Sequence, residues 1–132
     1  MDFKYPKNEK LKSRKTIDLL FTEGKSVARF PLRLAYIEGD FGESFDGDKI
    51  KIGVSVSKKY FKSAVDRNYF KRILRETYRL NKHILNGNLN KPYALMLLYQ
   101  TKERLDYHEI NDKTIQLFEK FLAAVGSKKG QL

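Results

Sequence analysis

The chain has 132 residues, no cysteine and a formal net charge of +11. This length predicts a single domain over residues 1–132, and 41% hydrophobic residues, with 9 Phe and 8 Tyr, favour a packed interior over a disordered chain. The lack of cysteine excludes disulfides and thiolate metal sites. The N-terminus has no apolar run typical of a signal peptide, and the longest apolar stretch, YALMLLY, is too short to span a bilayer. We therefore expect a cytoplasmic protein.

The N-terminal part of the chain predicts a basic arm followed by a short helix. Residues 1–12 are interpreted as an extended arm that becomes ordered only against the rest of the fold or a partner. Ser13 can cap a helix, and Gly24 lies just past its predicted end. This helix places three apolar side chains on one face, those of Ile17, Leu20 and Phe21.

Three strands are predicted next. SVARF favours a brief strand, and the alternation of apolar residues in LRLAYIE and in KIKIGVSVSKK predicts two longer ones. Between them lies a turn-rich acidic loop, residues 39–48. We expect the two longer strands to pair with each other as a hairpin.

The second half of the chain predicts two helices around one strand. Residues 63–85 carry the longest helical pattern, and the turn residues 86–88 close it. YALMLLYQ predicts a buried central strand, residues 109–125 a packing helix and residues 126–132 a flexible tail. The resulting order of helix, strands, helix, strand and helix predicts a single-domain α+β sandwich, with a mostly antiparallel sheet of about four strands packed by helices.

The positive charge is concentrated in two segments. Residues 1–15 carry six basic and two acidic side chains, residues 58–82 carry nine and two, and the rest of the chain has twelve of each. Scattered charge would suffice for solubility, whereas localised positive charge is typical of a surface that binds a polyanion, most often nucleic acid. An anionic membrane or an acidic protein is the alternative partner for such a surface.

The helix predicted over residues 63–85 separates a basic stripe from an apolar stripe. At roughly 100° per residue, the basic side chains and one amide fall within an arc of roughly 140°. They are Arg67, Asn68, Lys71, Arg72, Arg75, Arg79 and Lys82. An ordinary solvated face mixes charge signs, but Arg67, Lys71 and Arg75 are like charges at i,i+4 spacing, which a bound polyanion would relieve. Three lysines that precede the helix extend this surface: Lys58, Lys59 and Lys62.

The segment VSVSKKYFKSAVDRNYFKRILRE closely resembles the signature of the bacterial ribonuclease P protein component. In that family a strand ending in Ser-Lys-Lys leads to Ala-Val, then Arg-Asn-Arg, Lys-Arg and a further Arg. The matching positions here are Ser57, Lys58, Lys59, Ala64, Val65, Arg67, Asn68, Lys71, Arg72 and Arg75. The basic arm, LKSRKTIDLLFTEGKSVA, YALMLLY and the closing helix also appear in the order of the family, so the resemblance covers most of the chain.

The sequence departs from the family at three places. Tyr69 stands where the family motif usually has a second Arg, so one cation is replaced by an aromatic ring. Ile17 replaces an aromatic residue of the first helix. After YALMLLY, where a basic residue is common, Gln100 and Thr101 precede Lys102.

The resemblance implies an accessory subunit of an endoribonuclease whose catalytic centre lies in a partner RNA. That RNA removes the 5′ leader of precursor tRNA with Mg²⁺ held largely by RNA phosphates, and the protein itself binds no cofactor. The basic helix would bind the catalytic RNA, and a cleft formed by the sheet and the first helix would bind the single-stranded leader. The cleft positions that the resemblance implies are Ile17, Phe21 and Tyr36; core packing is the other role open to Phe21 and Tyr36.

Other functions remain open on the sequence alone. A ribosomal or general RNA-binding protein could share an α+β fold, because fold does not determine function. A protein nuclease would need carboxylates or histidines near the basic face, where only Asp66 and Glu76 occur, on diverging sides of the helix. Helix-in-groove DNA binding is a third alternative, although no helix-turn-helix spacing precedes the basic helix.

Overall fold

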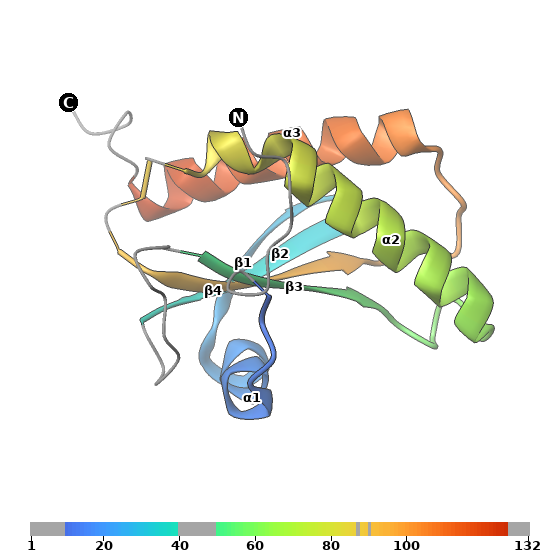
Figure 1. The fold of residues 1–132 in the computed structure, drawn as a ribbon, viewed down its shortest axis with the longest axis horizontal. Coiled ribbons are helices and arrows are strands. Elements are labelled where there is room, and N and C mark those ends of the chain that lie inside the picture. The colour runs from blue at the N-terminus through green and yellow to red at the C-terminus, as the bar shows by residue number, and fades with distance from the viewer. Residues whose placement is uncertain (1–9, 40–49, 87, 90, 127–132) are drawn as a thin grey trace.

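The computed structural model describes residues 10–39, 50–86, 88–89 and 91–126. Most of the predicted arm, acidic loop and tail therefore lie outside the described residues. Three α-helices, a short 3₁₀ helix and four strands form the described part (Figure 1). Their bounds are α1 Arg14–Glu23, β1 Lys25–Arg29, β2 Leu32–Glu38, β3 Ile50–Val56, α2 Ala64–Asn81, η2 Lys82–Ile84, β4 Tyr93–Tyr99 and α3 Tyr107–Val125. None of the helices described has the length and apolar character needed to cross a bilayer.

The sheet has the strand order β1-β2-β4-β3. Strand β2 pairs antiparallel with β1 and with β4, whereas β3 pairs parallel with β4. The predicted hairpin of β2 and β3 is therefore wrong, because β4 lies between them. The predicted central position of YALMLLY is confirmed, and all of its residues except Leu98 are buried. An almost continuous apolar strand gains most from a position with a neighbour on each edge and cover on both faces.

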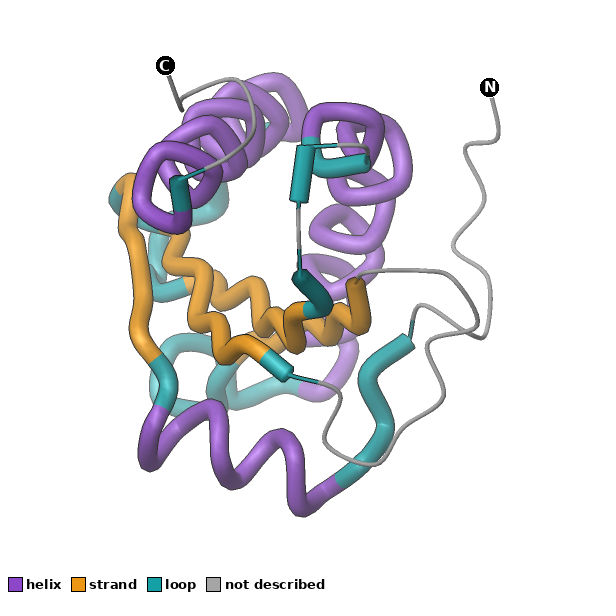
Figure 2. The backbone as a smooth tube through the Cα atoms, turned by 90° about the vertical axis from the view of Figure 1, so that its left-hand side faces the viewer, coloured by secondary structure: helices purple, strands orange, loops and turns teal. Residues whose placement is uncertain are grey.

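Helices cover both faces of the sheet. Helices α2 and α3 lie on one face and α1 lies on the other (Figures 1 and 2). The larger core lies under α2 and α3 and includes Leu34, Leu95, Leu97, Phe70 and Phe118, all fully buried. A smaller cluster packs under α1: Leu11, Leu20, Ala35, Ala94 and Met96. The α+β sandwich is as expected, and its two faces provide two different surfaces.

Buried hydrogen bonds fix the position of α2 against α3. The Asn81 Nδ2 donates to the Thr77 carbonyl at 2.8 Å and to the Asn111 Oδ1 at 2.7 Å. The Thr114 hydroxyl donates to the Ile110 carbonyl at 2.9 Å and lies 3.1 Å from the Thr77 hydroxyl. Because these buried polar atoms have hydrogen-bond partners, their burial costs little free energy. The contact with α3 also sets the orientation of α2, so that its opposite face is turned to solvent.

Helix α1 begins and ends where the sequence predicts. The Ser13 side chain accepts a hydrogen bond from the Thr16 amide at 3.2 Å, and the Gly24 amide donates to the Leu20 carbonyl at 3.1 Å. Gly24 has an ordinary φ of −75°, so conformation alone does not require glycine there. A Cβ at this position would instead lie 2.4 Å from the Leu20 oxygen and 3.0 Å from the Tyr36 oxygen. Glycine therefore allows the helix end to approach β2 closely.

Replacing Gly24 with Ala should destabilise the fold by forcing this backbone contact apart. We expect Gly24→Ala to lower the free energy of unfolding by about 1–3 kcal/mol in urea titrations followed by circular dichroism. Gly53→Ala is the matched control, because its Cβ would be tight only against the end of the Met96 side chain, at 3.2 Å, and would meet the Leu11 Cβ at an ordinary 3.6 Å. It should cost less than about 1 kcal/mol, and equal losses would contradict the role given to Gly24.

Candidate nucleic-acid interface

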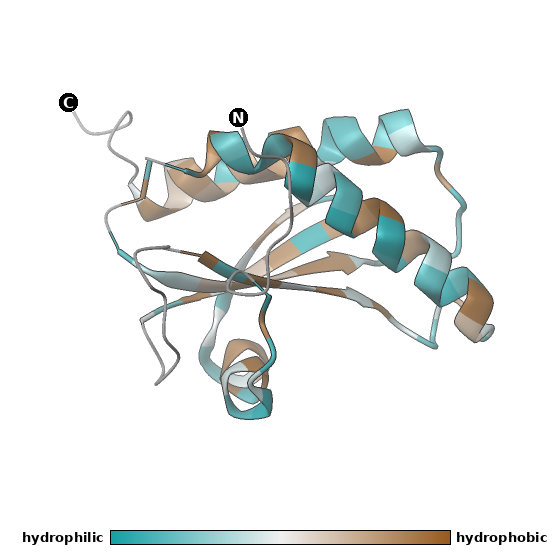
Figure 3. Cartoon of the chain, viewed as in Figure 1, coloured by the Kyte–Doolittle hydropathy of each residue, from teal (hydrophilic) through white to brown (hydrophobic). Residues whose placement is uncertain are grey.

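The solvent face of α2 carries several cations. Asn68, Arg72 and Arg75 are exposed and Lys71 is half-buried, whereas the opposite face of α2 is buried in the core. In the described part of the chain, no salt bridge reaches Lys71, Arg72 or Arg75. Colouring by hydropathy shows this outward side as mainly hydrophilic (Figure 3). Three unpaired cations on one helical face create a local positive potential that suits a polyanion.

Other cations of α2 are engaged within the protein. Arg67 is half-buried, and its Nη1 donates to the carbonyls of Phe61 at 2.9 Å and Lys62 at 2.8 Å. Arg79 forms an ion pair with Glu76 one turn earlier. Both side chains thus have partners within the protein. The hydrogen bonds of Arg67 also hold the loop that leads into α2.

Lys82 lies apart from the exposed stripe to which the sequence pattern assigned it. It begins the 3₁₀ helix η2 and is 6% exposed. The stripe pattern requires an α-helix that continues through residue 82, but α2 ends at Asn81 and a 3₁₀ helix begins at Lys82, so the direction of the side chains changes there. Lys82 is therefore a buried side chain and not part of the outward surface.

The lysines before α2 lie on an ordered turn at the end of β3. The Ser57 side chain accepts a hydrogen bond from the Lys59 amide at 3.0 Å, and the Ser57 carbonyl accepts from the amides of Tyr60 and Phe61. Lys58, Lys59 and Lys62 are all exposed. The turn therefore holds these lysines on the surface next to the N-terminal end of α2.

Arg104 joins this surface from the loop after β4, and the sequence pattern did not indicate it. Its Nη1 lies 3.1 Å from the Asp66 Oδ1, and its guanidinium lies 5.2 Å from the ring centroid of Phe70 and 5.9 Å from that of Tyr69. These are ion-pair and cation–π geometries. Helical periodicity could not reveal this contact, because it joins two elements that are distant in the chain.

The Tyr99 hydroxyl holds the loop that carries Arg104. It donates to the Glu103 carbonyl at 2.5 Å and accepts from the Leu105 amide at 3.1 Å. Burial raises the pKa of Tyr99, while the hydrogen bond from Leu105 opposes this rise. The hydroxyl therefore keeps its proton and remains a donor at neutral pH.

The two acidic residues near the basic face are each paired with an arginine. Asp66 pairs with Arg104, and Glu76 pairs with Arg79, so each carboxylate already has a cation as partner. Among the described residues, no three His, Asp or Glu side chains gather closely enough to hold a metal. The arrangement suits binding of an anion better than acid–base or metal-assisted cleavage.

Two hollows flank α1 on the opposite face of the sheet. One has a volume of about 280 Å³, and its lining includes Ile17, Gly53 and Met96. The other has a volume of about 210 Å³, and its lining includes Phe21 and Arg33. Phe21 is 57% exposed, so it is not a core residue, and Ile17 is half-buried. Both hollows thus combine apolar walls with access to solvent.

Cations from four segments line these hollows. Lys10 and Lys12 line the larger one together with Arg75 of α2. Lys25 and Arg33 line the smaller one, and Arg33 donates to the Ser26 hydroxyl at 2.7 Å and to the Gln100 side chain at 3.3 Å. Because Arg75 belongs to both the basic helix and the larger hollow, the two surfaces meet at the edge of β3.

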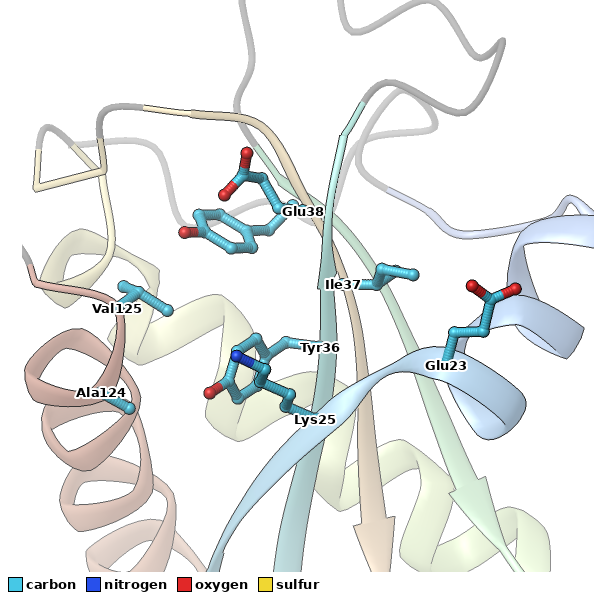
Figure 4. A pocket seen from close by; sticks show the side chains of 8 residues that line it. Glu23, Lys25, Tyr36, Ile37, Glu38, Ala124 and Val125 are labelled. Carbon is cyan, nitrogen blue, oxygen red and sulfur yellow. The ribbon is translucent and has the colours of Figure 1, made fainter.

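The structure does not bring Tyr36 together with Ile17 and Phe21. The Tyr36 ring lies on the face covered by α3, where its centroid is 5.0 Å from that of Phe121 and 6.3 Å from that of Tyr93. Figure 4 shows Tyr36 and Ile37 pointing to opposite sides of β2, with Ile37 toward α1. Successive side chains of a strand alternate between faces, so Ala35 is the neighbour that faces α1. Tyr36 therefore lies on the other face of the sheet from Ile17 and Phe21.

Tyr36 instead borders a third hollow, of about 250 Å³, at the end of the sheet near α3 (Figure 4). Tyr93 also lines it, and burial together with the Glu38 carboxylate raises the pKa of Tyr93. The Glu38 carboxylate lies 3.4 Å from the Lys91 amine. Both tyrosine rings pack edge-to-face against Phe121 of α3 in this part of the fold.

Comparison with known proteins finds relatives of one kind. A family model described as Ribonuclease P matches residues 5–122. Two relatives are named Ribonuclease P protein component. The one from Porphyromonas gingivalis is 43% identical over 89 residues, which are 67% of this chain and 63% of the relative. The one from Dictyoglomus thermophilum is 31% identical over 118 residues, which are 89% of this chain and 92% of the relative. The match thus spans slightly less than two thirds of the P. gingivalis protein.

Solved structures of such proteins have a similar fold. The Staphylococcus aureus RNase P protein aligns with a TM-score of 0.68 at 20% identity, covering 86% of this chain and 94% of that one. The Thermotoga maritima RNase P protein aligns with a TM-score of 0.66 at 25% identity, covering 85% and 96%. The helices and the mixed, mostly antiparallel sheet described above therefore match those structures.

Arg67 should contribute to stability, unlike the free cations of the same helix. Removing its two hydrogen bonds in Arg67→Ala should lower the free energy of unfolding by about 1–2 kcal/mol, because the Phe61 and Lys62 carbonyls lose a charged donor. Arg72→Ala is the control and should stay within about 0.5 kcal/mol of the unaltered protein. Denaturant titrations measure both values, and an unchanged stability of Arg67→Ala would show that its bonds are not needed.

Proposed function

Because this chain belongs to the bacterial ribonuclease P protein family, we propose that it is the protein subunit of ribonuclease P in tRNA 5′ maturation. In this role it binds a catalytic RNA and the 5′ leader of precursor tRNA, and the RNA performs the endonucleolytic cleavage. The observation that carries this proposal is the unpaired cationic face of α2, formed by Lys71, Arg72 and Arg75. The paired state of Asp66 and Glu76 further favours a binding role for this chain.

The basic helix is the proposed contact with the catalytic RNA. Its cations would bind backbone phosphates, Arg through a planar fork and Lys as a point charge. Asn68 is exposed on the same helix and adds an amide that can both donate and accept hydrogen bonds. The lysines of the turn before α2 would extend the contact. Arg67 and Arg79 already use some of their N–H groups within the protein, so only their remaining N–H groups would bind RNA. A phosphate contact of this kind gives affinity but no sequence preference.

The α1 side of the sheet is the proposed surface for the single-stranded leader. Single strands are commonly bound by apolar or aromatic faces together with cations that follow the backbone. Phe21 offers an exposed ring, Ile17 an apolar wall, and Arg33 and Arg75 offer cations at the two hollows. Arg75 belongs both to the basic helix and to the lining of the larger hollow. A leader bound in this hollow would therefore lie close to a catalytic RNA bound on α2.

Mg²⁺ enters this proposal through the RNA. When bound to RNA phosphates, Mg²⁺ stabilises charge that develops at the scissile phosphate. The part of the chain's contribution that overlaps with Mg²⁺ is electrostatic, because cations on α2 reduce the repulsion between catalytic RNA and substrate. The protein should therefore matter most when Mg²⁺ is scarce.

Single-turnover cleavage of precursor tRNA at low Mg²⁺ tests the proposed function. A bacterial ribonuclease P RNA should cleave faster with this protein than without it. The double variant Arg72→Ala/Arg75→Ala should lose most of this acceleration, and the slope of log affinity for the RNA against log salt should fall by about 1.4 to 1.8 units for two lost phosphate contacts.

The control for this variant removes the same charge elsewhere. Lys91 and Lys120 are exposed and lie outside α2, and the double variant Lys91→Ala/Lys120→Ala has the same net charge as the test variant. It should keep both the acceleration and the salt slope. Tight RNA binding without any acceleration of cleavage by a cognate RNA would favour a general RNA-binding protein instead.

Leader binding predicts a selective effect at Phe21. Its ring is 57% exposed, so Phe21→Ala should leave the fold intact. It should weaken binding of precursor tRNA by about 5- to 100-fold, the range for one lost stacking contact, and should leave binding of mature tRNA and of the catalytic RNA unchanged. Phe30→Ala is the matched control, because Phe30 is 71% exposed and lines neither hollow. Equal losses with precursor and mature tRNA would argue against a leader contact at Phe21.

A further inference from the structure

The N-terminal turns of α2 expose two apolar side chains within the basic surface. Val65 is 77% exposed and Tyr69 is 45% exposed. They are four residues apart, so both lie on the same side of the helix. The first turn of α2 is correspondingly coloured hydrophobic in Figure 3, unlike much of its outward face. Exposed apolar groups in an otherwise charged surface indicate a contact that is not purely electrostatic.

The Tyr69 ring is held in place by its neighbours. It stands nearly perpendicular to the buried Phe70 ring, with centroids 5.0 Å apart and an interplanar angle of 85°. The Arg104 guanidinium lies 5.9 Å from its centroid and is fixed by the 3.1 Å ion pair with Asp66. The ring is therefore positioned before any partner binds, and stacking on it would cost little further conformational entropy.

One cation contacts the ring, and two others are exposed on neighbouring parts of the same segment. Arg104 is half-exposed beside it, with 55% of its side chain accessible. Arg72 lies one turn further along α2 and is exposed, and Lys62 is exposed just before the helix. An aromatic face with cations at its border matches a nucleotide, in which a flat base is joined to a phosphate.

We propose that Tyr69, with Val65 and Arg104 beside it, is a stacking platform for an unpaired nucleobase of the partner RNA. The base would stack on the Tyr69 ring, and Arg104 and Arg72 would contact the flanking phosphates. This inference rests on the proposed function and adds to it a contact that distinguishes unpaired from paired RNA. A paired base could not reach the ring, because its faces are stacked within the helix.

Charge argues against a second copy of the chain as the occupant of this patch. A second copy of the chain would bring the same segment, residues 58–82, with nine basic and two acidic side chains, against itself. The nearby carboxylate, that of Asp66, is already paired with Arg104. Self-association through Val65 and Tyr69 would therefore bring like charges together, whereas an RNA would neutralise them.

The test compares variants at Tyr69 in binding to a bacterial ribonuclease P RNA at several salt concentrations. Tyr69→Ala should raise the Kd by about 5- to 100-fold, the range for one stacked base, with the salt slope unchanged because no charge is removed. Tyr69→Phe keeps the ring and should stay within about twofold of the unaltered protein. Arg104→Ala should instead lower the salt slope by about 0.7 to 0.9 units.

A short RNA of fixed sequence, used as a single strand and as a duplex, provides the second measurement. Tyr69→Ala should weaken binding of the single strand and leave duplex binding unchanged, since the duplex offers no unstacked base. Circular dichroism and thermal unfolding would verify that Tyr69→Ala is folded, because the ring also contacts Phe70.

Different failures separate this inference from the function on which it rests. If Arg72→Ala/Arg75→Ala loses RNA affinity while folded Tyr69→Ala binds like the unaltered protein, the platform is wrong and the proposed function stands. If Tyr69→Ala weakens single-strand and duplex binding equally, the ring does not stack a base. If the unaltered protein binds no ribonuclease P RNA, both proposals fail. A change in sedimentation caused by Tyr69→Ala, with RNA affinity unchanged, would assign the patch to self-association.

Discussion

The parallel pairing of β3 with β4 determines where the basic helix can lie. Two parallel neighbours cannot be joined by a tight turn, because the chain must return across the sheet before the second strand begins. Helix α2 makes that return between Val56 and Tyr93. One face of α2 must therefore pack on the sheet, and the other must face solvent. Among the described residues, the exposed cations of α2 lie on the side of the helix that faces away from the sheet.

Strand alternation divides the remaining functional residues between two surfaces. Side chains of β2 point in turn to the large core under α2 and α3 and to the smaller cluster under α1. Tyr36 belongs to the first set and Ala35 to the second. The two surfaces meet at the edge of β3, where Arg75 and the chain at Lys10 line one hollow. The Leu11 amide donates to the Ile52 carbonyl at 3.0 Å, which pairs part of this edge.

The cations near α2 have three different roles that composition alone does not separate. Arg67 supports the loop before the helix, and Arg79 and Arg104 pair with carboxylates. Only part of the row of like charges therefore remains unpaired, at Lys71, Arg72 and Arg75 in the described structure. This pairing reduces the repulsion within the helix, yet it leaves enough free charge to attract a polyanion.

The sequence by itself determined the elements, the central position of YALMLLY and the two-sided character of α2. These features depend on local periodicity, which each segment carries without reference to the others. Helix α1 was likewise predictable, because Ser13 and Gly24 mark its ends through contacts within a few residues. The resemblance in the segment around Arg67 and Asn68 pointed to the family for the same local reason.

Only the tertiary structure decided which elements meet. Pairing β3 with β4 rather than with β2 depends on contacts between distant segments, and so does the face on which Tyr36 lies. Arg104 reached Tyr69 through the loop held by Tyr99, a contact that no spacing in the sequence encodes. Local patterns specify which side chains each segment can bury. Which segments then pack against each other depends on the free energy of the whole core, so no single segment encodes it.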